Sequence, residues 1–553
     1  MLPLLLLLAL AGGPQAVPDS PFQPHVVWFI ADDLSPIMAA YGDSTVHTPH
    51  LDRLAQEGVT VERAYVTTPV CAPSRTAMLT GVYPTSMGAL HMRTQRRTSA
   101  LDQVTEPELL AIPTYEAVPP PDVLPVTIYL QRAGYFTANL GKEDYQFATP
   151  AGLWHARTDT AHWRQRPDPT QTFFYIHNDV ETHESQIWGR AGQPLAVHPA
   201  AVRVPAYYPD TSIVRRDIAQ QYTNLLATDA NVGRVLAELE ADGLLESTVF
   251  IFVGDHGDGL PRAKRDLYDS GLRVPLIVRI GAEVRAALGD RLGAPPPGGR
   301  ITHPVSGVDL APTLLALAGL PVPAAMQGLP FLGDPQAPER RYAVGVKGRM
   351  DPSVNETRAV TDGRWKYIRN LQPERPYVQT LPYRDRVATM QLLRQLHAKG
   401  ALTGPPALWF RATKPAEELY DTHADPDEVR NLATDPRLNA TLARLRGALD
   451  AWADATGDLG VLPEPQLIRR LWPPDGTQPT TAAPVPDLSA HGNTYTVTLT
   501  SATPGALLAY AIDGQAWRPY TGPFEATAET TLTLRAHRLG HLPADTVLQL
   551  PQP

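Results

Sequence analysis

The 553-residue chain contains a single cysteine, Cys71, so no disulfide can form within it. An exported chain of this length is expected either to pair its cysteines or to have none, and a lone cysteine therefore indicates either a chemical role or a small buried side chain. Stability must come from a buried hydrophobic core and from any bound metal. A chain this long is expected to divide into at least two domains.

The chain also lacks an excess of positive charge, and it lacks long apolar runs. The net charge of −9 argues against broad nucleic-acid binding, and no nucleic-acid partner is expected. It also means that an anionic substrate needs a locally positive site. Beyond the N-terminus, no stretch is long and apolar enough for a transmembrane helix, so no membrane span is expected.

The N-terminus carries a short apolar run, Leu4 to Leu8, followed by small residues up to Ala16. This pattern predicts a secretory signal peptide over residues 1–16. The run is too short to span a bilayer. We therefore expect a secreted or periplasmic protein.

Two apolar segments each end in residues that bind metals. His25 to Ile30 leads into Asp32 and Asp33, and Thr248 to Val253 leads into Asp255 and His256. Both segments are typical of buried parallel strands, which place functional residues at their carboxyl ends. Carboxylate oxygens with one imidazole favour a hard divalent cation. The alternative for Asp32 and Asp33 is a solvated turn after a strand.

The composition along the chain predicts several parts. Residues 17–335 are expected to form an α/β domain with a central, mostly parallel sheet flanked by helices. Residues 336–472 form a smaller antiparallel sheet-plus-helix subdomain, with two strands around an Asp-Gly turn at Asp362. Residues 473–486, rich in Pro, Thr and Ala, indicate a linker, and residues 487–553 alternate as in a small all-β sandwich.

The lone cysteine lies in Cys71-Ala72-Pro73-Ser74-Arg75, which resembles the Cys-x-Pro-x-Arg signature of type I sulfatases, members of the alkaline phosphatase superfamily. Other motifs of that family follow in the same order, and the resemblance covers about residues 24–452. The motifs are Asp32-Asp33, Gly81-Val82-Tyr83-Pro84-Thr85, Gly141-Lys142, His183, Gly254-Asp255-His256-Gly257, Lys264 and Arg273-Val274-Pro275. The C-terminal segment is similar to the β-domain of chitobiases and hexosaminidases.

The resemblance implies an alkaline-phosphatase-like fold and a formylglycine made from Cys71 by a formylglycine-generating maturation enzyme. One hydroxyl of the hydrated aldehyde would attack sulfur, and the other would drive release of sulfate. It also implies a bound cation, best fitted by calcium with magnesium or manganese as alternatives. Its ligands would be Asp32, Asp33, Asp255, His256 and the oxygen of the modified Cys71.

Further roles follow from the same resemblance. Arg75 would contact the formylglycine oxygen, and Lys142 and Lys264 would neutralise the sulfate oxygens. His183 is the candidate general acid for the leaving alcohol or amine, with an ordinary loop histidine as the alternative.

Three more residues are candidates for contact with the substrate or with the formylglycine. Asp144 stands where many sulfatases carry a histidine two residues after the lysine, as a base on the formylglycine diol or as a substrate contact. His91 and Arg93 are candidate substrate contacts, with a structural role as the alternative.

The sequence thus predicts a sulfatase that hydrolyses sulfate esters on a sulfated carbohydrate. One alternative keeps the fold and changes the bond, giving a phosphonate monoester or phosphodiester hydrolase. Another is a non-catalytic glycan-binding relative.

Overall fold

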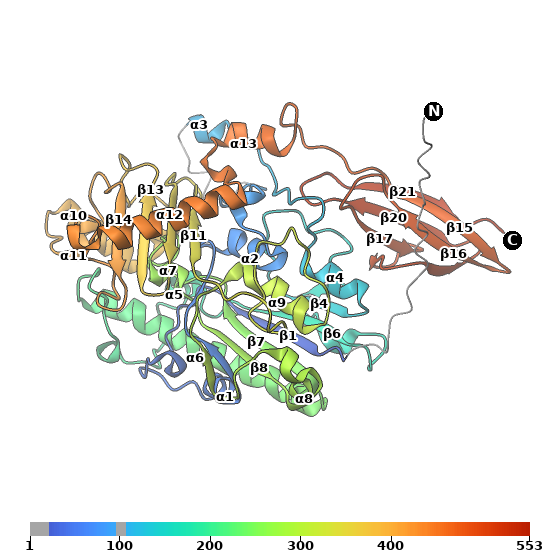
Figure 1. The fold of residues 1–553 in the computed structure, drawn as a ribbon, viewed down its shortest axis with the longest axis horizontal. Coiled ribbons are helices and arrows are strands. Elements are labelled where there is room, and N and C mark those ends of the chain that lie inside the picture. The colour runs from blue at the N-terminus through green and yellow to red at the C-terminus, as the bar shows by residue number, and fades with distance from the viewer. Residues whose placement is uncertain (1–21, 96–106, 553) are drawn as a thin grey trace, which may run out of the picture.

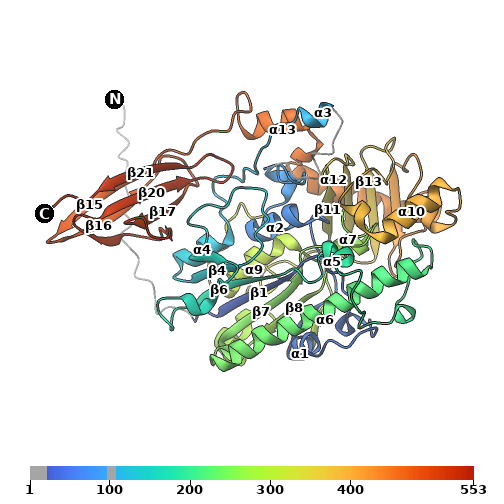
Figure 2. The ribbon, with the colours of Figure 1, turned by 180° about the vertical axis from the view of Figure 1, so that it is seen from behind.

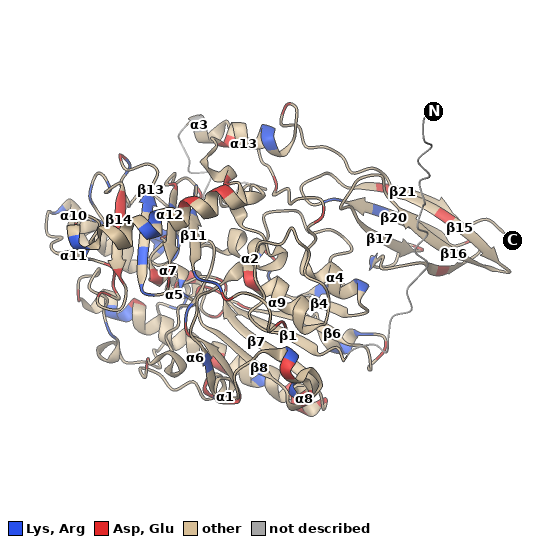
Figure 3. Cartoon of the chain, in the orientation of Figure 1, with Lys and Arg blue, Asp and Glu red and all other residues tan. Residues whose placement is uncertain are grey.

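The computed structural model describes residues 22–95 and 107–552, so the predicted signal peptide lies outside the described residues. An α/β domain forms the centre of the molecule, with a smaller antiparallel sheet at one end and a β-sandwich at the other (Figure 1). Acidic and basic residues are intermixed over all three parts (Figure 3). Within the described ranges, no helix has the length and apolar character needed to cross a membrane.

The central sheet has eight strands in the order β5-β4-β6-β1-β7-β8-β2-β9. The pairs from β5 to β7 are all parallel, while β8 runs antiparallel to both of its neighbours. The predicted α/β class with a mostly parallel sheet is confirmed. The strands are β1 (His25–Ala31), β2 (Gly58–Val61), β4 (Phe136–Leu140), β5 (Ala156–Thr158), β6 (Phe173–Asp179), β7 (Thr248–Gly254), β8 (Leu276–Ile280) and β9 (Gly299–Ile301).

Helices cover both faces of this sheet because its central strands are apolar on both sides. In β1, Val26, Trp28 and Ile30 pack into one core, and Val27 and Phe29 pack into the other. The first core holds α2 (Cys71–Thr80), α4 (Val126–Arg132), α8 (Ala282–Leu288) and α9 (Leu310–Leu317). The second core holds α1 (Pro49–Glu57), the long α6 (Ser212–Ala241) and α10 (Ala388–Ala398), and Figure 2 shows α6 running along that face.

The smaller sheet is antiparallel, in the order β11-β12-β13-β14, and α12 (Asn439–Thr456) packs against it. The predicted Asp-Gly turn joins its two middle strands, with Gly363 in the left-handed region at φ +93°. The strands are β11 (Ala343–Lys347), β12 (Thr357–Thr361), β13 (Trp365–Asn370) and β14 (Glu417–Asp421). This arrangement confirms the predicted antiparallel sheet-plus-helix unit.

Two antiparallel sheets enclose a small core at the C-terminus, as predicted for a β-sandwich. One sheet comprises β15 (Val485–His491), β16 (Thr494–Thr500) and β19 (Phe524–Thr527). The other comprises β18 (Arg518–Pro519), β17 (Leu507–Ile512), β20 (Thr531–His537) and β21 (Ala544–Gln549).

The sandwich packs directly against the catalytic domain. Leu507 in β17 is buried in the same core as the central sheet, and a Cβ at Gly152 would lie 3.2 Å from that of Ala509. The segment predicted as a linker is also bonded: Thr481 N donates to Leu542 O at 2.8 Å, and Trp472 Nε1 just before the segment donates to Gly540 O at 2.8 Å. The sandwich is therefore a docked part of the structure.

We expect Leu507→Ala to lower the free energy of unfolding by about 2–4 kcal/mol, because it opens a cavity where the sandwich meets the catalytic domain. Urea unfolding followed by tryptophan fluorescence measures this change. Leu542→Ala is the matched control, since Leu542 is 46% exposed and should lose almost nothing. Equal stability of the Leu507 variant and the parent would contradict the docked arrangement.

Candidate functional site

The site begins where the two central strands end. β1 and β7 are paired in parallel, with Ala31 opposite Gly254, so the residues that follow each strand emerge side by side. The backbone N–H of Asp33 donates to Asp255 Oδ1 at 3.0 Å and ties the two strand ends together. Asp32, Asp33, Asp255 and His256 are each at most 1% exposed.

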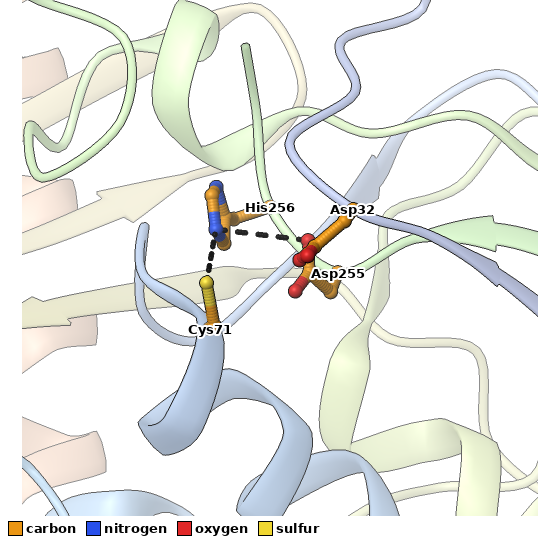
Figure 4. A group of neighbouring side chains, drawn as sticks. All are labelled: Asp32, Cys71, Asp255 and His256. Atoms are coloured by element: carbon orange, nitrogen blue, oxygen red, sulfur yellow. Dashed lines mark hydrogen bonds and ion pairs between the residues drawn. The ribbon is translucent and has the colours of Figure 1, made fainter. Parts of the chain in front are cut away.

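Helix α2 brings the cysteine to these strand ends. It begins at Cys71, and all of its residues are buried. The Sγ of Cys71 lies 3.2 Å from His256 Nε2 and 3.9 Å from Asp33 Oδ1. Figure 4 shows Cys71 facing His256, with Asp32 and Asp255 beside them; one donor atom from each of the four lies within 4.8 Å of the others. The structure thus gathers the predicted nucleophile and the predicted metal ligands.

Three cations lie on these carboxylates. Arg75, one turn after Cys71, donates from Nε to Asp255 Oδ2 at 2.9 Å and from a terminal nitrogen to Asp32 Oδ1 at 3.3 Å. Lys142, just after β4, contacts both oxygens of Asp32 at 2.9–3.0 Å. Lys264 contacts both oxygens of Asp33 at 2.9 Å. All three predicted cationic residues therefore converge on the carboxylates around Cys71.

The close charges shift the protonation of the groups at the centre. Burial disfavours charge on the Cys71 thiol, but Lys142 and Lys264 hold its pKa well below the ordinary value. Burial likewise opposes ionisation of Asp32, yet Lys142 and Arg75 hold the pKa of that carboxyl low. For Asp255, burial and the neighbouring Asp32 raise the pKa. The repulsion between the buried Asp32 and Asp255 carboxylates is therefore not fully offset by the cations that contact them.

This donor set fits a hard divalent cation. Asp32, Asp255, His256 and Cys71 bring one donor atom each within 4.8 Å of one another, and Asp33 Oδ1 lies 3.0 Å from His256 Nε2. All of these side chains are buried, and oxygen-rich ligation with one nitrogen suits calcium, magnesium or manganese. A bound cation would relieve the repulsion that raises the pKa of Asp255.

His183 lies close to Cys71 and Asp33. Its Nδ1 accepts the backbone N–H of Ser185 at 3.3 Å and lies 2.8 Å from Ser185 Oγ, at the start of α5 (Glu184–Gly189). A neutral ring whose Nδ1 accepts a hydrogen bond carries its proton on Nε2. One ring nitrogen lies within 4.8 Å of Cys71 Sγ and an Asp33 oxygen. Although burial disfavours the imidazolium, the Asp33 carboxylate raises the pKa of His183. A proton-donor role fits this geometry.

A cavity of about 620 Å³ is lined by Gly141 and Glu143, the two neighbours of Lys142, and by Ala72, the residue after Cys71. Arg93 and Asp144 both line it. The Asp144 carboxylate lies 3.3 Å from Lys142 Nζ and 4.0 Å from an Arg93 nitrogen. Burial opposes its charge, but Lys142 and Arg93 lower the pKa of Asp144. Of the two roles predicted for Asp144, this place in the cavity wall favours substrate contact.

His91 is placed apart from the others. It is 1% exposed, and its Nδ1 accepts the backbone N–H of Arg349 at 2.9 Å. Its Nε2 is buried and has no partner in the described part of the chain, and burial lowers its pKa to about 4. His91 does not line the cavity, and this environment favours the structural alternative.

Several residues that the sequence analysis did not single out complete the site. Asn178, near the end of β6, accepts from Arg75 at 2.5 Å, and Glu184 contacts Lys264 at 2.9 Å. Glu184 also holds Arg265 through two hydrogen bonds of 2.6–2.8 Å. The sequence offered one indication of these two residues, since Glu184 directly follows His183 and Arg265 directly follows Lys264. Asn178 is the next-to-last residue of β6 and pairs with Ile30, close to the end of β1 where Asp32 follows.

Comparison with known proteins places the chain in a family. The Sulfatase family model matches residues 24–320. An ulvan-active sulfatase from Formosa agariphila is 39% identical over 95% of this chain and 91% of its own length. The human N-sulphoglucosamine sulphohydrolase is 27% identical over 81% of this chain and 94% of its own length.

Solved structures agree on the fold. A 2-O GAG sulfatase superposes with a TM-score of 0.55 at 20% identity, covering 79% of this chain and 93% of that protein. A phosphonate monoester hydrolase from Silicibacter pomeroyi superposes with a TM-score of 0.55 at 18% identity, covering 79% and 97%. The fold alone therefore does not separate the two reaction classes, whereas the relatives in sequence are sulfatases. Because the family model spans more than half of the chain and the 39% identical relative spans nearly all of it, the chain belongs to the sulfatase family and is an enzyme that hydrolyses sulfuric esters.

Proposed function

We propose that this sulfatase removes sulfate from a sulfated polysaccharide, using a formylglycine made from Cys71 and a bound divalent cation, with calcium preferred. The observation that carries the chemistry is the contact of buried Cys71 with the Asp and His cluster and its surrounding cations. Support for a polysaccharide comes from the 39% identical relative, which is named for activity on ulvan. The polar cavity of about 620 Å³ beside Lys142 has room for a sugar residue.

The protein's own residues bind the sulfate and control the proton. The formylglycine supplies a hydrated aldehyde as the nucleophile toward sulfur. Lys142 and Lys264 neutralise the sulfate oxygens, and Arg75 holds the oxygen of residue 71 in place. His183 donates the proton on Nε2 to the leaving oxygen of the sugar, with Ser185 fixing the ring.

Asp32, Asp33, Asp255 and His256 would hold the cation, together with the oxygen of the modified Cys71. When bound there, the cation polarises the sulfate oxygens as a Lewis acid. We further propose that residues 1–16 export the chain to the periplasm or the medium, and that the host's formylglycine-generating enzyme modifies Cys71.

Replacing the nucleophile tests this proposal. We expect Cys71→Ala to reduce sulfate release from ulvan by roughly a thousandfold or more, because no aldehyde can form at this position. The parent is produced together with a formylglycine-generating enzyme, and sulfate is measured by ion chromatography. Circular dichroism should show an intact fold, and full activity of the variant would overturn the assigned nucleophile.

Replacing the proton donor tests the leaving-group chemistry. His183→Gln is expected to lower kcat on a sulfated sugar by about 10²–10⁴-fold, because an alkoxide leaves poorly without protonation. Turnover of 4-nitrophenyl sulfate should fall much less, since nitrophenolate leaves without a proton. An equal loss on both substrates would mean that His183 does not protonate the leaving oxygen.

Cation binding has a readout independent of turnover. After dialysis against a chelator, we expect the melting temperature to fall and added calcium to restore it, because the cation offsets buried carboxylate charge. Asp255→Asn should abolish the calcium response, whereas Asp290→Asn, at an exposed carboxylate, should retain it. A melting temperature indifferent to calcium, together with no metal in elemental analysis, would contradict the cation site.

A further inference from the structure

An aromatic surface lies beside His183, next to the start of α2. It consists of Trp188, Tyr383 and Arg386, which we call the aromatic shelf. Trp188 belongs to α5, which follows His183, while Tyr383 and Arg386 come from the segment before α10. Two parts of the chain almost 200 residues apart thus meet beside the catalytic centre.

Tyr383 connects the shelf to the nucleophile and to the proton donor. It packs against the small cluster that contains Val70 and Ala72, the two neighbours of Cys71. Its ring centroid lies 6.4 Å from that of His183. Tyr383 therefore lies next to both the start of α2 and the ring of His183.

The shelf continues outward from Tyr383. The ring of Trp188 meets that of Tyr383 edge-on, with centroids 5.2 Å apart at 79°. The guanidinium carbon of Arg386 lies 4.9 Å from the centroid of Trp188. A cation over an aromatic face is held in place without using its hydrogen-bond donors.

The polar groups of these three side chains have no hydrogen-bond or ion-pair partner among the described residues. Trp188 and Tyr383 are partly exposed, and Arg386 is exposed. Within residues 22–95 and 107–552, the side-chain hydrogen bonds and ion pairs involve neither Trp188 Nε1, nor the Tyr383 hydroxyl, nor the Arg386 guanidinium. The neighbouring Arg384 and Arg394, by contrast, each donate to the backbone oxygen of Gln379.

Partly exposed rings with free donors, contiguous with an active site, have the character of a binding surface. Ring faces and edges pack against the C–H groups of a sugar, and free N–H and O–H groups donate to its hydroxyls. A free guanidinium binds a carboxylate or sulfate through two parallel hydrogen bonds. A sulfated polysaccharide offers all three features on successive residues.

We propose that the aromatic shelf is a subsite for a second sugar of the polysaccharide, adjacent to the one whose sulfate is removed, with Arg386 binding an anionic substituent of that second sugar. The proposal rests on the proposed function and extends it: the enzyme recognises at least a disaccharide. The shelf determines affinity for longer substrates and takes no part in the reaction at sulfur.

Steady-state kinetics on size-fractionated ulvan oligosaccharides and on a monosaccharide sulfate test the subsite. Arg386→Gln should raise KM for oligosaccharides by about tenfold and leave kcat nearly unchanged, since a charged hydrogen bond to substrate is lost. Tyr383→Phe should raise KM less, because the ring remains. Neither change should affect the monosaccharide sulfate.

Arg364→Gln is the matched control. Arg364 is also exposed and lies 5.2 Å over a tryptophan, Trp365, at the end of the small sheet away from the site. It should leave both substrates unaffected. The proposal is overturned if Arg386→Gln leaves KM for oligosaccharides unchanged, or if it weakens the monosaccharide and oligosaccharide reactions equally, as a structural role would.

A binding titration separates failure of the subsite from failure of the proposed function. If the parent releases no sulfate from ulvan, the proposed polysaccharide activity fails. Calorimetry with the Cys71→Ala protein still measures binding of the same oligosaccharides. Binding that weakens about tenfold on adding Arg386→Gln supports the shelf, whereas binding that is absent or unchanged overturns it.

Discussion

The structure depends on a compact cluster of buried ion pairs around the thiol of Cys71. Asp32, Asp33 and Asp255 leave the ends of β1 and β7 and would repel one another if they were alone in a buried space. Arg75, Lys142 and Lys264 approach them from three other elements. Removing one partner from such a cluster leaves a buried charge uncompensated, which is far more costly than the loss of an exposed pair. The order of the strands, the start of α2 at Cys71 and the burial of every residue of that helix all serve to hold this cluster in one place.

The function of the protein follows from the positively charged side chains of this cluster and from the surfaces that surround it. The chain carries a net charge of −9, yet its cations gather where an anion must bind. Lys142, Lys264 and His183 all lie close to residue 71. The polar cavity lined by Arg93 and Asp144 includes Ala72, and the Tyr383 ring of the aromatic shelf packs against the small cluster that contains the same residue. A substrate with an anionic ester and more than one sugar ring matches this arrangement, of which a small aryl sulfate would occupy only a part.

Much of this arrangement could be predicted from the sequence because it is encoded locally. Apolar runs that end in Asp-Asp and Asp-His predict strands that deliver metal ligands to one edge of a sheet, and a lone cysteine before Pro73 and Arg75 resembles the sulfatase signature and so predicts the nucleophile. Contacts between segments that are far apart in the sequence are not indicated by any local motif. Tyr383 reaches His183 because the segment before α10 packs against Trp188 of α5, and nothing near residue 383 indicates that approach. His91 lies close to the nucleophile in sequence, but its burial against Arg349 depends on β11 and the loop that follows. The packing of the sandwich against the central domain through Leu507 could not be predicted from the sequence either, because an alternating strand pattern does not show which outer face will be covered.

The most direct test is the mass of the peptide that contains residue 71, from protein produced with and without a formylglycine-generating enzyme. We expect the peptide to carry an aldehyde in place of the thiol and to react with an aldehyde-specific hydrazide, and we expect sulfate release from ulvan to rise in proportion to the converted fraction. An unmodified thiol at residue 71 in protein that hydrolyses sulfate esters at full rate would contradict the formylglycine mechanism.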